Sequence, residues 1–190
     1  QIQIQKLQEL PHTNAILFEL LSPFGFTDLF AISDLLIAQS GKQIFSKTHR
    51  LLKDRDLLFL TENVSKDEIS EVFISESEKK ISEPIPLEFK STKKIGNITN
   101  TTIYVDRDKI KYPLLLRKWR EGDVFQPFGM QGKKKLSKFF KDEKLSLITK
   151  EKIWVLCSAN QIVWVVDFRL DDHFKVTQTT KQILKITRTS

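Results

Sequence analysis

The sequence predicts an α+β protein: a small module of two helices and a β-hairpin, followed by a mixed α/β C-terminal domain whose sheet is packed by one or two helices. Three observations lead to this prediction. Apolar residues recur at helical spacing near the start, short β-rich runs bounded by turn residues follow, and a basic run punctuated by glycine interrupts the strands of the second half. With 190 residues, of which 40% are apolar, the chain can bury a substantial core.

The first module is predicted to span residues 1–62. Thr13 or Asn14 caps a short amphipathic helix, and Thr27 caps a second one. Between residues 43 and 60, short apolar runs flank an Asp-Arg-Asp sequence, which is typical of a turn between two strands. The pattern therefore predicts a helical pair followed by a hairpin.

The remainder of the chain is predicted to be a linker and a second domain. Residues 63–100 form the predicted linker with short strands, because their first part is acidic and rich in serine. The C-terminal basic domain spans residues 101–190. Its clearest signal is a hairpin formed by residues 153–157 and 161–168, two β-rich runs around a Ser-Ala-Asn turn.

Charge is distributed unevenly between the two halves of the chain. Residues 1–90 carry 10 basic and 14 acidic side chains, whereas residues 91–190 carry 21 basic and 10 acidic ones. Ten of the 31 Lys and Arg residues lie between residues 111 and 144. Such a surplus favours phosphate-rich partners, although it also serves solubility.

An amphipathic helix is predicted for residues 133–145. Leu136, Phe139 and Phe140 share one face, and lysines occupy the opposite face. Lysines on such a face bind phosphates by releasing counterions, while a merely solvated face is the alternative. The cluster Arg117-Lys118-Trp119-Arg120 just upstream favours binding.

Three aromatic residues in the basic run have two interpretations. Trp119, Phe125 and Phe128 either stack on unpaired bases or belong to the core. Their alternation with polar residues favours the core. The glycines between them are turn residues, and no phosphate-binding Gly-Lys-Ser/Thr sequence follows.

Signatures of catalysis are weak. Asp171 and Asp172 beside His173 suggest either acid–base chemistry in a small hydrolase or, more simply, a turn after a strand. The three histidines have no metal-ligand spacing, so we expect no metal and no cofactor in this chain. Cys157, the single cysteine, lies in an apolar run and is expected to be buried.

The compartment follows from the cysteine count and from hydropathy. A single cysteine excludes an internal disulfide, and no apolar run reaches the roughly 18 residues that a membrane helix needs. We therefore expect a cytoplasmic protein that does not contact a membrane. The chain starts with Gln1 and its only methionine is Met130, so we expect it to begin downstream of the translational start.

The run LRKWREGDVFQPFGMQGKKKLSKFFKDEK and the following EKIWVLCSANQIVWVVDFRLDD resemble the C-terminal domain of tRNA(Ile)-lysidine synthetase. The earlier LPHTNAILFELLSPFGF and FSKTHRLLKDRDLLFL resemble the preceding domain of the Bacteroidetes-type enzyme. Asp167 stands where that family usually has glycine. The family pattern is matched by Arg120, Gly122-Asp123, Phe125, Pro127, Gly129-Met130, Gly132, Lys134-Lys135-Leu136, Ile162 to Val166 and Arg169.

The resemblance implies the C-terminal part of an ATP-dependent ligase that modifies tRNA by joining lysine to the wobble cytidine of tRNA(Ile). The family places ATP, with Mg, in an N-terminal domain that carries an SGGxDS loop, and that motif is absent from this sequence. The chain alone is therefore expected to bind tRNA, with its C-terminal domain on the acceptor stem, and to catalyse nothing. A protein-interaction domain with an incidental basic surface is the alternative. The residues expected to contact tRNA are Arg117, Lys118, Arg120, Lys133, Lys134, Lys135, Lys138, Lys141 and Arg169.

Overall fold

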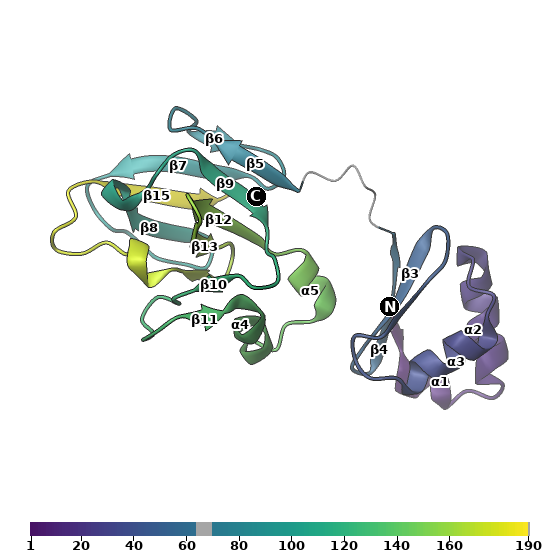
Figure 1. Ribbon diagram of the computed structural model, residues 1–190. Coiled ribbons are helices and arrows are strands. Elements are labelled where there is room, and N and C mark those ends of the chain that lie inside the picture. Colours follow the sequence, from purple (N-terminus) through teal and green to yellow (C-terminus); the bar gives the residue numbers. More distant parts are fainter. Residues whose placement is uncertain (64–69, 190) are drawn as a thin grey trace. The chain divides into compact units, whose positions relative to one another are not determined.

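The computed structural model describes residues 1–63 and 70–189 (Figure 1). The chain divides into two compact units, Gln1–Glu68 and Ile69–Ser190. Each unit has a hydrophobic core of its own.

The first unit packs helices against a four-stranded antiparallel sheet with the strand order β1-β4-β3-β2 (Figure 1). Leu17 and Leu35 of the helices are buried with Leu51 and Leu58 of the central strands. Its elements are β1 (Ile2–Gln3), α1 (Ile4–Gln8), α2 (Thr13–Leu21), the 3-10 turn η1 (Ser22–Phe24), α3 (Leu29–Ile37), β2 (Gln43–Phe45), β3 (His49–Asp54) and β4 (Leu57–Glu62).

The predicted helices and hairpin are present in this unit, but both predicted helix caps are wrong. The side chain of Asp28, not Thr27, caps α3 by accepting the backbone N–H groups of Phe30 and Ala31 at 3.0 and 3.1 Å. The carboxylate accepts hydrogen bonds from two N–H groups that would otherwise be unpaired. Its negative charge is also stabilised by the positive N-terminal end of the helix dipole, so aspartate is a better cap here than the neighbouring threonine. His12 stands at the N-cap of α2 and makes no side-chain capping bond.

The second unit contains two larger antiparallel sheets and one small ribbon. Their strand orders are β14-β13-β12-β9-β5, β6-β7-β15-β8 and β10-β11. The strands are β5 (Glu71–Ile74), β6 (Lys80–Ile81), β7 (Leu87–Thr92), β8 (Thr102–Asp106), β9 (Leu114–Lys118), β10 (Val124–Phe125), β11 (Lys134–Lys135), β12 (Trp154–Ser158), β13 (Gln161–Val165), β14 (Arg169–Leu170) and β15 (Ile183–Arg188). The helices are α4 (Leu136–Asp142) and α5 (Leu147–Glu151), and the 3-10 turns are η2 (Arg107–Lys109) and η3 (Asp172–Phe174).

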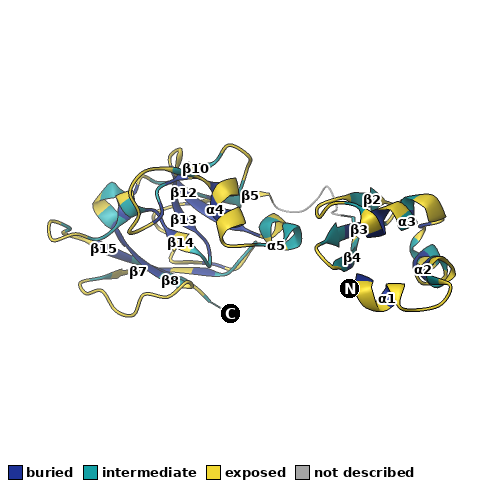
Figure 2. Ribbon diagram, turned by 90° about the horizontal axis from the view of Figure 1, so that it is seen from below, coloured by how far each residue is buried: buried dark blue, intermediate teal, exposed yellow. Residues whose placement is uncertain are grey.

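The five-stranded sheet lies between two hydrophobic layers, as the residues of β12 show. Trp154 and Leu156 pack into the core shared with the four-stranded sheet, while Val155 and Cys157 pack into the core beneath α4. Successive side chains of a strand point to opposite faces, so a strand covered on both sides is buried throughout. Figure 2 shows β12 and β13 as buried strands next to the mostly exposed α4.

The buried position of Cys157 confirms its prediction as a small core residue. Burial raises the pKa of its thiol to about 11, against a smaller lowering by the Arg117 charge. The thiolate is the nucleophilic form, so this cysteine is unreactive near neutral pH.

The predicted linker, residues 63–100, differs from the structure. Residues 64–69 lie outside the described residues, but β5 pairs with β9, and β7 pairs with β15 along its full length. The second unit consequently begins near Ile69 instead of residue 101. A local pattern can indicate a strand here, but it does not show that the strand pairs with β15, which lies far away in the sequence.

No single described helix is long and apolar enough to cross a membrane. The bent pair of helical segments Thr13–Phe24 and Leu29–Ile37 has, taken together, the length and apolar composition that a membrane span needs.

Candidate nucleic-acid interface

Several lysines lie close together at the end of the loop before β11, on β11 and on α4. Lys133, Lys135, Lys138 and Lys141 are exposed, and no ion pair involving them exists within residues 1–63 and 70–189. Lys138 and Lys141 lie three residues apart on α4 and therefore share a face. We call these four residues the lysine surface.

Lys134 differs from these four lysines because it forms an ion pair within the protein. Its ammonium contacts the Asp142 carboxylate at 2.6 Å and lies 6.0 Å from the centre of the Phe139 ring. The pKa of Asp142 is lowered, first by its hydrogen bond from Lys134 and further by the charges of Lys134, Lys138 and Lys141. Because the charges of three lysines all lower the pKa of this one carboxylate, the three ammonium groups lie near one another.

The helix that carries these lysines is shorter than predicted. It spans Leu136–Asp142, whereas the sequence pattern predicts residues 133–145. Lys134 and Lys135 instead form β11, which pairs with β10. The predicted apolar face is nevertheless correct, since Leu136, Phe139 and Phe140 are all buried. The same residues satisfy the helical spacing whether or not the preceding lysines join the helix.

Arg117, predicted to contact RNA, is bound inside the protein. Its guanidinium donates two hydrogen bonds of 2.8 Å to the two oxygens of Asp123, and both side chains are only 12–13% exposed. Burial raises the pKa of Asp123, but the hydrogen bonds from Arg117 and from the backbone N–H of Arg120, together with their charges, outweigh it, so the net pKa is lowered. The pair therefore closes the turn that contains Gly122.

The other two basic residues of this segment are also engaged. Lys118 lies 4.6 Å from the centre of the Trp154 ring in a cation–π contact. Arg120 donates to Glu71 at 2.8 Å, although its side chain remains 62% exposed. The structure thus separates the predicted set: the lysine surface faces solvent, while the basic residues at the end of β9 stabilise the fold.

Arg169 lies on β14 and has an exposed side chain. The turn before it contains Asp167, whose φ of 66° lies in the left-handed region that favours glycine. The carboxylate of Asp167 pairs with Arg188 at 2.7 Å. This backbone geometry accounts for the glycine that the family usually has here.

The three aromatic residues of the basic run divide between the two interpretations. Phe125 is 2% exposed and packs edge-on against Phe139, so it belongs to the core. Trp119 is half-buried, and its indole N–H donates to the Lys150 carbonyl at 2.7 Å. Phe128, by contrast, is 40% exposed at the loop between β10 and β11. Only Phe128 of the three presents an exposed ring.

Asp171, Asp172 and His173 hold a loop in place and do not form an acid–base site. Asp171 accepts the backbone N–H groups of Gln126 and His173 at 2.7 and 2.9 Å. Asp172 accepts the N–H of Gly129 at 3.0 Å and pairs with Lys175 at 2.7 Å, and these contacts lower its pKa. A lowered pKa is the reverse of what a general acid needs at neutral pH. The turn interpretation therefore explains these residues.

Sequence reasoning missed a group of residues near Phe128. Ile95 and Ile98 are exposed in the loop before β8, and they line a pocket together with Phe128, Arg169 and Lys175. The only indication of this pocket in the sequence is two isoleucines in an otherwise polar turn. Such isolated apolar residues do not by themselves predict a binding site.

Comparisons with known proteins assign both units. Residues 1–63 match the family model described as the TilS substrate binding domain, and residues 114–186 match the TilS substrate C-terminal domain. These two matches cover most of the residues that form the first unit and the five-stranded sheet of the second.

Two curated relatives align with almost the whole chain. A protein named tRNA(Ile)-lysidine synthase from Parabacteroides distasonis is 44% identical over 97% of this chain and 43% of its own length. A protein of the same name from Bacteroides thetaiotaomicron is 37% identical over 96% of this chain and 42% of its own length. The chain therefore spans less than half the length of these relatives.

A solved structure titled "Crystal structure of TILS C-terminal domain" covers 61% of this chain and 88% of its own, with 17% identity and a TM-score of 0.49. At this level the likeness adds no argument to the sequence matches.

Proposed function

We propose, from the premise that this chain belongs to the tRNA(Ile)-lysidine synthase family, that it binds tRNA through the lysine surface of its second unit. The observation that carries the proposal is the gathering of exposed lysines on β11 and α4, with no acidic partner in the described residues apart from the Asp142 that Lys134 engages. Such a surface attracts the phosphate backbone by charge. A-form RNA has a deep, narrow major groove, so binding of this kind reads shape more than sequence.

The substrate of the intact protein is proposed to be tRNA(Ile), with the second unit on the acceptor stem. In the intact protein, lysine would be joined to the wobble cytidine with ATP and Mg. The ATP-binding SGGxDS loop of the family is absent from this sequence, so the residues that would hold ATP and Mg are proposed to lie in another part of the intact protein. The proposal therefore assigns substrate binding to this chain and places no reaction step in it.

The salt dependence of binding tests the proposal. If four to six phosphates are neutralised, the logarithm of the association constant should fall with the logarithm of salt concentration with a slope of about −3 to −5. Fluorescence anisotropy of labelled tRNA(Ile) titrated with the chain at several salt concentrations gives this slope. A slope near zero would refute electrostatic binding.

A protein-interaction role is a second candidate, and two exposed apolar residues of the first unit favour it. Phe30 on α3 is 86% exposed, and Ile37, two turns further along the same helix, is 81% exposed. Under this hypothesis the lysines would be incidental, so charge changes on the lysine surface would leave partner binding unchanged.

A further inference from the structure

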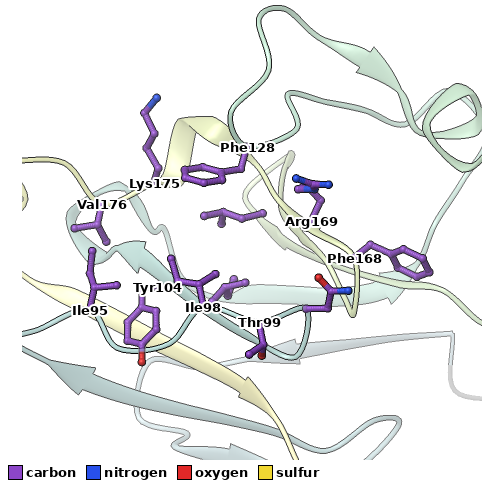
Figure 3. A pocket seen from close by; sticks show the side chains of 12 residues that line it. Ile95, Ile98, Thr99, Tyr104, Phe128, Phe168, Arg169, Lys175 and Val176 are labelled. Carbon is purple, nitrogen blue, oxygen red and sulfur yellow. The ribbon is translucent and has the colours of Figure 1, made fainter. Parts of the chain in front are cut away.

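Residues of the second unit line a pocket of about 250 Å³ (Figure 3). Ile95, Ile98 and Tyr104 form one wall, Phe128 faces them from the loop between β10 and β11, and Arg169 and Lys175 supply positive charge. The Phe168 backbone borders the pocket, but its ring packs towards Phe140, with 6.4 Å between ring centroids. The pocket is therefore apolar inside and cationic at its edge.

The exposure of the apolar lining shows that the fold does not need it as core. Ile95, Ile98 and Phe128 are 47%, 57% and 40% exposed, and they come from two segments that are distant in sequence. Isolated apolar residues on a surface need no explanation, but a converging group marks a binding site. A volume slightly below that of typical sites for drug-sized ligands suits a single planar ring system.

The charges around the pocket select an anionic occupant. Asp172 holds Lys175 at 2.7 Å, whereas Arg169 forms no ion pair within the described residues. An arginine with an open guanidinium can take a phosphate through two parallel hydrogen bonds. A ligand with a flat apolar part and an attached phosphate therefore matches both features.

The loop that carries Phe128 of the pocket also carries part of the lysine surface. Phe128 lies in the loop that joins β10 to β11, and Lys133 and Lys135 lie at the far end of the same loop and on β11. In space, the ring of Phe168, next to Arg169, packs towards Phe140 of α4. A polyanion bound along the lysine surface can thus place one more residue at the pocket. This continuity favours a nucleic acid over a free mononucleotide.

We propose that this pocket holds one unpaired nucleotide of the bound RNA, with its base against Phe128 and Ile98 and its phosphate at Arg169. The inference rests on the proposed function, since it concerns the RNA held by the lysine surface. Stacking on an aromatic ring tolerates any base, so the site is expected to recognise an unpaired nucleotide and not its identity.

Two RNA hairpins with the same stem and loop test the proposal, one blunt and one with a single-stranded 3′ extension. The wild-type chain should bind the extended hairpin about tenfold more tightly than the blunt one, because stacking of one base contributes an effect of that order. Phe128→Ala and Arg169→Gln should each reduce this difference while leaving affinity for the blunt hairpin nearly unchanged. Met130→Ala is the matched control, since Met130 is 50% exposed in the same loop but does not line the pocket.

Each other outcome overturns the inference. Equal wild-type affinity for both hairpins would exclude an unpaired nucleotide, as would a Phe128→Ala variant that keeps the full preference. Self-association of the wild type that Phe128→Ala abolishes, measured by sedimentation, would assign the pocket to a second copy of the chain. Binding of neither hairpin would refute the proposed function as well, whereas equal binding of both would leave it intact.

Discussion

Replacement of Lys138 and Lys141 by glutamate is expected to weaken tRNA binding about 100-fold near physiological salt. Each substitution removes a phosphate contact and adds a repelling charge, and a tenfold loss for each residue is of the expected order. The salt slope should also become shallower by about 2, because each lost lysine–phosphate contact lowers it by about 1. Anisotropy titrations of labelled tRNA at several salt concentrations measure both quantities.

The matched control changes net charge equally on another surface. Lys90 and Lys185 face each other on β7 and β15, and their neighbours Phe89 and Leu184 point into the core, so both lysines lie on the outer face of the four-stranded sheet. Lys90→Glu with Lys185→Glu should weaken binding only slightly through the change in overall field. Equal losses in the two double variants would show that net charge, and not the lysine surface, determines affinity. Unchanged tRNA binding in both would favour the protein-interaction role.

Removal of the Asp123 carboxylate is expected to have the largest effect on stability. Asp123→Ala should lower the free energy of unfolding of the second unit by about 3 kcal/mol, because it leaves the largely buried Arg117 guanidinium without its partner. The turn at Gly122 would also lose its hydrogen bond from the Arg120 backbone N–H to Asp123. Urea unfolding followed by tryptophan fluorescence measures the loss.

The ion pair of Asp142 and Lys134, whose carboxylate is exposed, provides a matched control for this prediction. Asp142 is 50% exposed, and exposed ion pairs contribute little to stability, so Asp142→Ala should lower the free energy of unfolding far less than Asp123→Ala. A cost for Asp123→Ala as small as that for Asp142→Ala would show that the buried pair is not the main support of the turn.

The stabilising effect of Asp123 should also depend on pH. Its folded-state pKa lies below the unfolded value of about 3.9, so the folded state is stabilised above that pH and the contribution is lost as pH falls through the folded pKa. The wild type should therefore lose part of its unfolding free energy in acid below about pH 4. Asp123→Asn should lose less over the same interval, because it has no carboxylate to protonate.

The elements that could be predicted from sequence are those whose signals are local. The hairpin of β12 and β13 was predicted because two β-rich runs flank a short turn, and the apolar face of α4 because Leu136, Phe139 and Phe140 recur at helical spacing. The pairing of β7 with β15 could not be predicted, since nothing in either strand specifies a partner so distant in the chain. Local patterns therefore indicate individual strands of the four-stranded sheet but not how they pair.

The candidate site shows the same limit at the level of single residues. The sequence alone does not show whether a lysine or arginine side chain pairs with an acidic group inside the protein or faces solvent. Arg117 and Lys138 lie in the same basic run, yet one pairs with Asp123 inside the unit and the other faces solvent. The Arg-Glu-Gly-Asp sequence shows that Asp123 is near the arginines along the chain. Whether its carboxylate reaches Arg117 depends on the position of β9 in the sheet, which the sequence does not show.

Site-specific photo-crosslinking tests the central claim most directly. A photoreactive amino acid placed at position 138 should form a covalent adduct with tRNA on irradiation, and unlabelled tRNA should suppress the adduct by competition. The same group at position 185, on the outer face of the other sheet, should form little or none. Adducts at position 185 but not at position 138, or equal adducts at both, would contradict binding of tRNA by the lysine surface.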